Sequence, residues 1–236
     1  MDRFDIVIEC QEQLERLIAE WGFLPFFRSG IAGFSIEEMT PRELLFGDEF
    51  NTGPWQWKGP IIGNWQTAYG KFFRGKAGYV SLDWLPDFVN WRRTLFPLNS
   101  ESTDAKHILD VLQQNESMLS KQLKHASGFT LSRKHMSANE NGLRGNGMAF
   151  DALIAQLQMG TYVCIADFEY QLNRQGNTYG WGVARYSTPE AMYPDIITAK
   201  MTRTPEQSRQ RIINHLSNIL PDVPTAKIER LIGMPH

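Results

Sequence analysis

Hydrophobic residues recur at intervals of three and four in several stretches of the chain, which predicts amphipathic helices. In residues 9–21, Leu14, Leu17, Ile18 and Trp21 follow this spacing, and Gly22 is a helix stop. Ser35 and Glu38 form the pattern of a capping box, so a second helix is expected to begin near residue 36. That helix is expected to include residues 41–44 after a break, and a short helix is expected to begin at Pro189 with Thr188 as its cap. Further helices are predicted over residues 83–93, 104–115, 116–126, 149–158, 204–220 and 225–232.

Other stretches favour β-structure. Residues 67–82 contain two β-prone runs around Arg74-Gly75-Lys76, which predicts a hairpin, and residues 161–171 and 179–187 predict two strands joined by a turn. The segment GFLPFF, interrupted by Pro25, is expected to be a buried turn or a short edge strand. Residues 47–64 and 129–147 are rich in Gly, Asn and other turn-forming residues, so both are predicted as loops. No internal repeat stands out in the sequence.

Together these elements predict an α+β fold that is mainly helical. From residue 104 to 186 the order is helix, turn, helix, loop, helix, strand, turn, strand, which is typical of a winged helix-turn-helix unit with a β-hairpin wing. A tandem arrangement of such units is left open. Residues 97–103 form a linker, so we expect an N-terminal helical and hairpin domain rich in aromatics over 1–98. A winged-helix domain with C-terminal helices is expected over 104–236.

Composition restricts the class of protein. The chain has 236 residues, of which 42% are hydrophobic, and two cysteines, which cannot form a disulfide framework or a zinc cluster. No apolar run approaches the roughly 18 residues that a membrane span requires. The first residues lack the pattern of a secretory signal. We therefore expect a cytoplasmic protein that does not insert into a membrane; the sequence does not indicate its oligomeric state.

The net charge of −2 conceals a polarised chain. Residues 1–50 contain 11 acidic and 4 basic residues, whereas residues 51–147 contain 7 acidic and 12 basic ones. A net charge near zero argues against nucleic-acid binding. However, the electrostatic field near each part of the surface governs encounter with a polyanion, and the separation of acidic from basic residues sets that local field. An acidic helix face packed beside a basic one explains the same pattern. The distribution of charge therefore does not decide between nucleic-acid binding and packing within the protein.

The helix over 149–158 is expected to seal a three-helix core and to present its outer face to a DNA groove. That outer face carries Asp151, Gln156 and, by its position, Gln158, and it contains no Lys or Arg. Cations flank the helix instead and are expected to contact the DNA backbone. They are Lys121, Lys124, Arg133, Lys134, Arg144 and Arg174.

Aromatic residues are dense between residues 55 and 96 and alternate with cations. Bases stack on such rings, so this stretch is a second candidate nucleic-acid surface, with Lys71, Arg74, Arg92 and Arg93 as its cations. The alternative is that most of the rings are core residues. Trp55 and Trp57 lie in a predicted loop and are the candidates for base stacking.

Catalytic signals are weak. There is no phosphate-binding Gly loop, zinc-ligand spacing or nucleophile elbow, and we expect neither a metal nor a cofactor. The acids Glu37, Glu38, Asp48 and Glu49 border the aromatic stretch and are weak candidates for an acid/base site. A capping role at the start of a helix explains Glu37 and Glu38 as well.

Three segments resemble the bacterial AlkZ-related proteins, distant relatives of the YcaQ and AlkZ winged-helix DNA glycosylases. They are WGFLPFF (21–27), AYGKFFRGKAGYVSLDWLPDF (68–88) and LQMGTYVCIADFEYQLNRQGNTYGWGVARYSTPE (157–190). The resemblance implies tandem winged-helix units on duplex DNA and, in the true glycosylases, excision of alkylated or crosslinked bases. Those enzymes carry a Gln-x-Gln or Gln-x-Asp motif, where this chain has Pro25 and Phe27.

The sequence therefore favours a DNA-binding winged-helix protein without a recognisable catalytic motif, linked to DNA repair, whose partner is double-stranded DNA. The first alternative is a DNA glycosylase that excises alkylated or crosslinked bases from an extruded nucleotide. The second is a protein-interaction scaffold that binds no nucleic acid.

Overall fold

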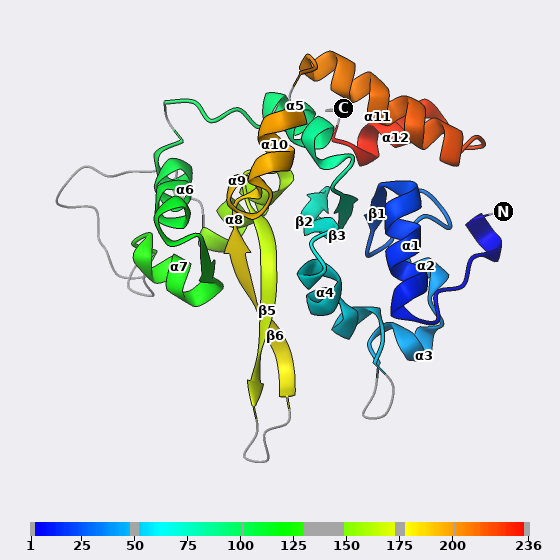
Figure 1. The fold of residues 1–236 in the computed structure, drawn as a ribbon, viewed down its shortest axis with the longest axis horizontal. Coiled ribbons are helices and arrows are strands. Elements are labelled where there is room, and N and C mark those ends of the chain that lie inside the picture. The colour runs from blue at the N-terminus through cyan, green and yellow to red at the C-terminus, as the bar shows by residue number, and fades with distance from the viewer. Residues whose placement is uncertain are drawn as a thin grey trace.

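The computed structural model describes residues 3–47, 52–100, 102–129, 149–172, 178–200 and 202–233. In these ranges the chain forms an α+β fold in which helices surround one antiparallel sheet (Figure 1). The helices are α1 (Gln11–Trp21), α2 (Ile36–Met39), α3 (Arg42–Leu45), α4 (Pro54–Gly63), α5 (Leu85–Leu95), α6 (Thr103–Asn115), α7 (Ser120–Ala126), α8 (Phe150–Met159), α9 (Pro189–Met192), α10 (Pro194–Lys200), α11 (Pro205–Ile219) and α12 (Thr225–Leu231), after a 3-10 turn at Arg3–Asp5. Across the described part of the chain, no helix combines the length and the apolar character needed to cross a bilayer.

The sheet has the strand order β1-β3-β2-β5-β6-β4, and all its pairs are antiparallel. The strands are β1 (Phe23–Pro25), β2 (Thr67–Phe73), β3 (Lys76–Ser81), β4 (Ser117–Leu119), β5 (Cys164–Leu172) and β6 (Thr178–Ser187). Both predicted hairpins are confirmed, and the segment with Pro25 is a short strand at one edge of the sheet, where a missing N–H is tolerated. The β5–β6 hairpin extends away from the body of the molecule (Figure 1).

The structure contains a repeat of two units, although no internal repeat stands out in the sequence. A first unit, α1 to β3, and a second unit, α6 to β6, follow the same order of helix, strand, helix, helix, strand, strand, with the second helix of the first unit split into α2 and α3. In each unit the last strand pairs with both other strands of that unit. The pair Tyr69↔Ile165 joins β2 to β5 and thereby the two half-sheets.

The repeat extends to the backbone conformation. Helix α4 starts at residue 54 and α8 at residue 150, 96 residues later, and both have ten residues. Each is followed by a non-glycine residue with positive φ, Trp65 at 56° and Thr161 at 58°, again 96 residues apart. Non-glycine residues rarely adopt this conformation. Its recurrence at equivalent positions shows that the two units make the same turn from their third helix into the sheet.

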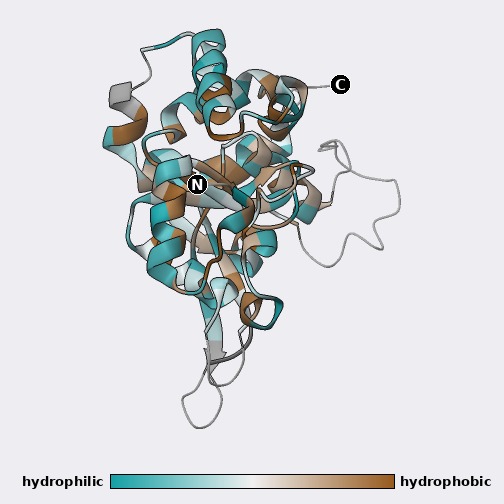
Figure 2. Cartoon of the chain, turned by 90° about the vertical axis from the view of Figure 1, so that its right-hand side faces the viewer, coloured by the Kyte–Doolittle hydropathy of each residue, from teal (hydrophilic) through white to brown (hydrophobic). Residues whose placement is uncertain are grey.

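Most of the longer helices are amphipathic, and hydropathy changes repeatedly along them (Figure 2). Their apolar residues form two clusters. The smaller one belongs to the three helices of the second unit, as predicted, and the larger one includes residues from both sides of the segment 97–103, among them Phe88 and Ile165. The division of the chain into domains at that segment stays a prediction.

Three elements differ from the sequence-based predictions. Residues 54–63 form a helix, not a loop, because Gly53 and Pro54 start it and Trp57, Ile61 and Ile62 are buried in the core. The segment expected as one helix over 116–126 begins with β4, which completes the sheet beside β6. Helix α10 was not predicted.

Gly22, which ends α1, adopts a φ of +70° and leaves room for the indole of Trp84. A Cβ at this position would lie 2.3 Å from Trp84 Cδ1, and that ring stacks on His215 with a centroid distance of 4.1 Å. Gly22→Ala is therefore expected to lower the free energy of unfolding by about 2–4 kcal/mol, since strain and steric overlap add. Gly30→Ala is the control in urea denaturation: its φ is also positive but no atom lies within 4 Å, so a loss of about 1 kcal/mol is expected. Equal losses would contradict the contact.

Candidate nucleic-acid interface

The second unit builds its core from residues of α6, α7 and α8, together with Phe129 after α7 and Val163 before β5. The buried members are Ala105, Ile108, Leu112, Leu123, Phe129, Phe150, Leu153, Ile154, Leu157 and Val163. Helix α8 ends where Gly160 donates its N–H to Gln156 (2.8 Å), and Thr161 then turns the chain into β5. This packing fixes which side of α8 is exposed.

The exposed side of α8 carries Asp151 and Gln156. Gln158 does not belong to it, contrary to the prediction: its side chain is buried, and its Oε1 accepts the N–H of Lys71 on β2 at 2.9 Å. Gln158 therefore joins α8 of the second unit to β2 of the first. The exposed face of α8 has no positive charge, so phosphate contacts require other elements.

Helix α7 supplies one group of cations. Lys121 and His125 are exposed, and Lys124 is half-buried with its Nζ 5.8 Å from the ring centroid of Phe150. Lys121 and His125 also line an open hollow of about 630 Å³ between α7 and the start of β4. We call Lys121, Lys124 and His125 the α7 group.

The β2–β3 hairpin supplies a second group. Its two-residue turn, Arg74 and Gly75, has φ values of 54° and 78°, the double positive φ of a tight hairpin turn. Arg74, Lys76 and Arg28 line a hollow of about 260 Å³, and Lys71 is exposed on β2. We call Arg28, Lys71, Arg74 and Lys76 the hairpin group.

Arg28 was missed by the sequence-based reasoning. It reaches the hairpin because β1 pairs with β3 and Phe26 donates its N–H to Ala77 at 2.8 Å. Lys76 Nζ then donates to the carbonyl oxygen of Arg28 at 2.7 Å. The α7 group and the hairpin group line different hollows, and α7 lies well apart from β2 and β3 in Figure 1, so the predicted cations form two surfaces.

Two arginines that were predicted to contact phosphates form interactions within the protein instead. Arg92 is 1% exposed and donates to the carbonyl oxygens of Met159 (2.6 Å) and Ile232 (2.9 Å). Arg93 forms an ion pair with Glu190 (2.6 Å) and donates to the carbonyl oxygen of Thr161. Arg92 therefore cannot contact a phosphate, and Arg93 already has a carboxylate partner.

The candidate stacking residues lie on α4, not in a loop. Trp57 is 7% exposed, and its Nε1 donates to Thr52 Oγ1 at 3.1 Å. Trp55 is half-buried in a cluster with Phe26, Phe27 and Phe46. Most rings of residues 55–96 are core residues, as the alternative stated.

The ammonium of Lys58 lies 3.1 Å from the ring centroid of Trp55 and 4.4 Å from that of Phe168 on β5. Lys58 is 3% exposed, and desolvation lowers its pKa to about 7. Sequence reasoning missed this residue because the segment was assigned to a loop.

The described candidate acids have structural partners. Glu37 Oε2 accepts the N–H of Arg28 at 2.9 Å. Glu38 Oε2 accepts from Ser35 Oγ at 2.6 Å, and Ser35 Oγ accepts the N–H of Glu38, so Ser35 caps the start of α2 as predicted, although the reciprocal bond of a full capping box, from the N–H of Ser35 to Glu38, is not formed. Both carboxylates thus shape the backbone around α2. Asp48, Glu49, Arg133, Lys134, Arg144 and Arg174 lie outside the described residues.

The described geometry defines an α+β protein of two repeated units that share one sheet, with exposed cations on α7 and on the β2–β3 hairpin. The family model described as AlkZ related matches residues 8–233, so the chain belongs to the AlkZ-related family, as the resemblance predicts. The comparisons found no match among the curated proteins and none among the solved structures.

Proposed function

We propose that this protein binds double-stranded DNA through two winged-helix units and takes part in DNA repair. The order of helix, strand, helix, helix, strand, strand, with the last strand between the other two, is typical of a winged helix, and it occurs twice. The membership in the AlkZ-related family supports the link to repair. The observation that carries DNA binding is the exposure of cations on the second helix of one unit and on the hairpin of the other.

These cations suit contacts to the DNA backbone more than recognition of bases. Lysine and arginine on loops, hairpins and helix ends neutralise phosphates and position the protein, without reading sequence. The exposed face of α8, with Asp151 and Gln156, adds polar groups but no positive charge. Binding with little sequence preference is therefore proposed.

Base excision is the weaker proposal. It requires a polar pair near the extruded nucleotide. Where the resemblance expects that pair, this chain has Pro25, which is buried in β1, and Phe27, which is half-buried against the rings of Phe26 and Trp55, and neither side chain is polar. The described candidates Glu37 and Glu38 hold backbone groups around α2.

Charge reversal of each cationic group tests the proposed interface. Lys121→Glu/Lys124→Glu and Lys71→Glu/Arg74→Glu are each expected to weaken duplex binding at least about tenfold, because each removes two phosphate contacts and introduces repulsion. Fluorescence anisotropy with a labelled duplex measures the affinity. The control is Lys227→Glu, an exposed lysine of α12 that belongs to neither group.

The outcomes separate the three functions. Equal affinity of both double variants and the control would contradict the interface. Absence of duplex binding by the folded protein at low salt would favour a protein-interaction scaffold. Release of alkylated bases, detected by strand cleavage at abasic sites, would favour the glycosylase.

A further inference from the structure

The hollow of about 260 Å³ at the hairpin group lies between the residues that follow β1, the β2–β3 hairpin and the end of α12. Its lining consists of three cations, one hydroxyl and two apolar residues: Arg28, Arg74, Lys76, Ser29, Phe73 and Leu231. Phe73 and Leu231 are almost fully buried, whereas all three cations are exposed. A ligand that enters the hollow therefore reaches the charged groups directly.

No carboxylate in the described part of the chain neutralises these cations. None of the residues that line the hollow is acidic, and the described ion pairs do not include Arg28, Arg74 or Lys76. Glu37 accepts the backbone N–H of Arg28 (2.9 Å) and forms no ion pair with its guanidinium. Three like charges around one hollow repel one another, so an anionic ligand would stabilise the arrangement.

Long-range contacts of the backbone bring the three cations together. Because β1 pairs with β3, Phe26 donates its N–H to Ala77, and Arg28 comes to lie beside the hairpin. Lys76 Nζ donates to the carbonyl oxygen of Arg28 at 2.7 Å, which fixes that ammonium at the hollow. Arg74 occupies the hairpin turn with a φ of 54°, a conformation that is disfavoured for an arginine. The hollow is thus built by the fold of the first unit and not by one flexible segment.

The number and type of the cations favour a phosphate monoester. A guanidinium can bind two phosphate oxygens at once, and an ammonium binds another as a point charge. A phosphate monoester offers three terminal oxygens and a charge of about −1.5 to −2 at neutral pH. A phosphodiester within a strand offers two such oxygens and a single charge. The volume of the hollow is below the range of about 300–1,000 Å³ of small-molecule sites, so it suits one phosphate group whose organic part stays outside.

We propose that this hollow binds a phosphate monoester at the end of a DNA strand. The inference rests on the proposed DNA binding, and it adds a preference for strand ends that contacts to the duplex backbone do not have. In this arrangement Arg28 and Arg74 bind the terminal phosphate oxygens and Lys76 completes the neutralisation. The α7 group and Lys71, which does not line the hollow, contact phosphates within the strands.

Fluorescence anisotropy with three duplexes of one sequence tests the proposal. Their ends carry hydroxyl groups only, 5′-phosphates or 3′-phosphates, and the label is attached to an internal base. One of the phosphorylated duplexes is expected to bind at least about tenfold tighter than the hydroxyl-ended duplex at the same salt concentration. This ratio should decrease between about pH 7.5 and about pH 5.5, because the monoester, with a second pKa of about 6, loses charge whereas the backbone phosphates do not.

Matched variants locate the site. Arg28→Ala and Arg74→Ala should each reduce the preference for the phosphorylated duplex to about twofold or less, because each removes a guanidinium from the hollow. Lys71→Ala removes an exposed cation of the same hairpin outside the hollow and should retain the preference. Lys121→Glu/Lys124→Glu should weaken the binding of all three duplexes and leave the preference unchanged.

The outcomes distinguish this inference from the proposed function. Equal affinities for the three duplexes would overturn the strand-end site and leave DNA binding intact, whereas no binding of any duplex would contradict both. A preference that Arg28→Ala and Arg74→Ala retain would also overturn the site. Thymidine 5′-monophosphate should compete only weakly with the phosphorylated duplex. If this nucleotide alone binds as tightly as that duplex, the ligand is a free nucleotide and the assignment to strand ends is wrong.

Discussion

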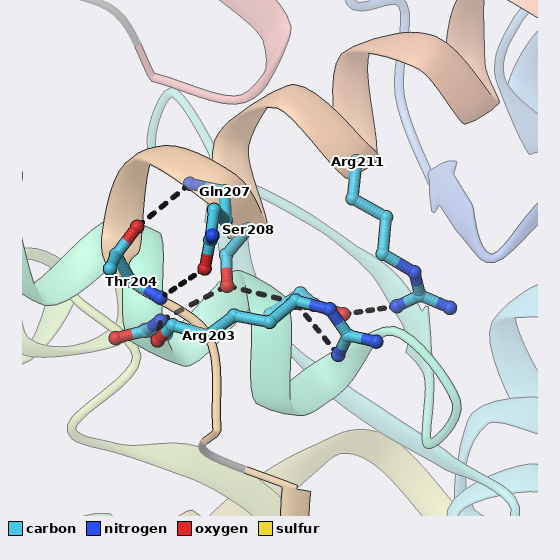
Figure 3. A network of polar contacts seen from close by, with 7 residues as sticks. Arg203, Thr204, Gln207, Ser208 and Arg211 are labelled. Carbon is cyan, nitrogen blue, oxygen red and sulfur yellow. Dashed lines mark hydrogen bonds and ion pairs between the residues drawn. The ribbon is translucent and has the colours of Figure 1, made fainter.

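Asp87→Ala is expected to lower the free energy of unfolding by about 2–4 kcal/mol, one of the largest effects of a single substitution in this protein. Asp87 is 3% exposed on α5 and accepts a hydrogen bond from Ser208 Oγ on α11 at 2.8 Å (Figure 3). Arg211 donates to its other carboxylate oxygen, and Arg203 lies 3.6 Å away. The alanine variant removes the acceptor that joins α5 to α11, and it leaves the buried Ser208 hydroxyl with one partner fewer.

The neighbouring contacts show why this loss cannot be repaired locally. Asn90 Nδ2 donates both to Ser208 Oγ (3.0 Å) and to the carbonyl oxygen of Arg203 (2.8 Å), so the network holds the start of α11 as well (Figure 3). The guanidinium of Arg211 also stacks on Trp84, 4.0 Å from its ring centroid. Chemical denaturation measures the effect, with the exposed Asp110→Ala on α6 as control, expected within about 0.5 kcal/mol of wild type. A loss no larger than that of the control would contradict the role of Asp87.

Lys58→Met is expected to stabilise the protein by about 2–4 kcal/mol at pH 6, because it replaces a buried ammonium by an apolar side chain of similar length. No described carboxylate forms an ion pair with Lys58, and the rings of Trp55 and Phe168 offset only part of the lost hydration. The unfolded chain keeps the usual lysine pKa of 10.5, whereas burial lowers the pKa in the folded state to about 7.

The sign of the pH dependence follows from these two values. Between pH 7 and 10.5 the unfolded state binds a proton at Lys58 that the folded state does not bind, so wild-type stability rises with pH there. Below pH 7 both states are protonated and the full cost of the buried charge is present. The advantage of Lys58→Met should therefore be smaller at pH 9 than at pH 6 by about 2–3 kcal/mol. Lys227→Met, at an exposed position, is the control; a gain that does not change with pH would contradict the burial of the ammonium.

Elements defined by local patterns were predictable from the sequence. The spacing of Leu14, Leu17, Ile18 and Trp21 predicted α1, and the two β-prone runs around Arg74-Gly75 predicted the hairpin, because both patterns depend on neighbouring residues. Helix α4 was missed because its glycines and prolines are turn signals, and the burial of Trp57 and Ile61 that stabilises it is a tertiary effect. The two units left no repeat in the sequence pattern, because they share element order and backbone conformation, which different side chains can specify; only the family resemblance pointed to a tandem arrangement.

For the candidate site, too, features that depend on local sequence were predictable, and features that depend on long-range contacts were not. The exposure of Lys121 follows from its place on a local amphipathic helix. The burial of Arg92 does not, since its acceptors Met159 and Ile232 are distant in the chain. Arg28 likewise joins the hairpin through pairing between β1 and β3. Local composition identifies cations, but long-range contacts decide which of them reach the surface together.

The dependence of duplex affinity on salt tests the account's central claim, that this protein neutralises DNA phosphates, most directly. The logarithm of the binding constant should fall linearly with the logarithm of the salt concentration, with a slope of about −0.9 for each phosphate contacted and about −3 to −4 for four contacts. The slope should be less steep by about 2 in each charge-reversal double variant. An affinity that does not change with salt, or no measurable binding at low salt by the folded protein, would contradict the account.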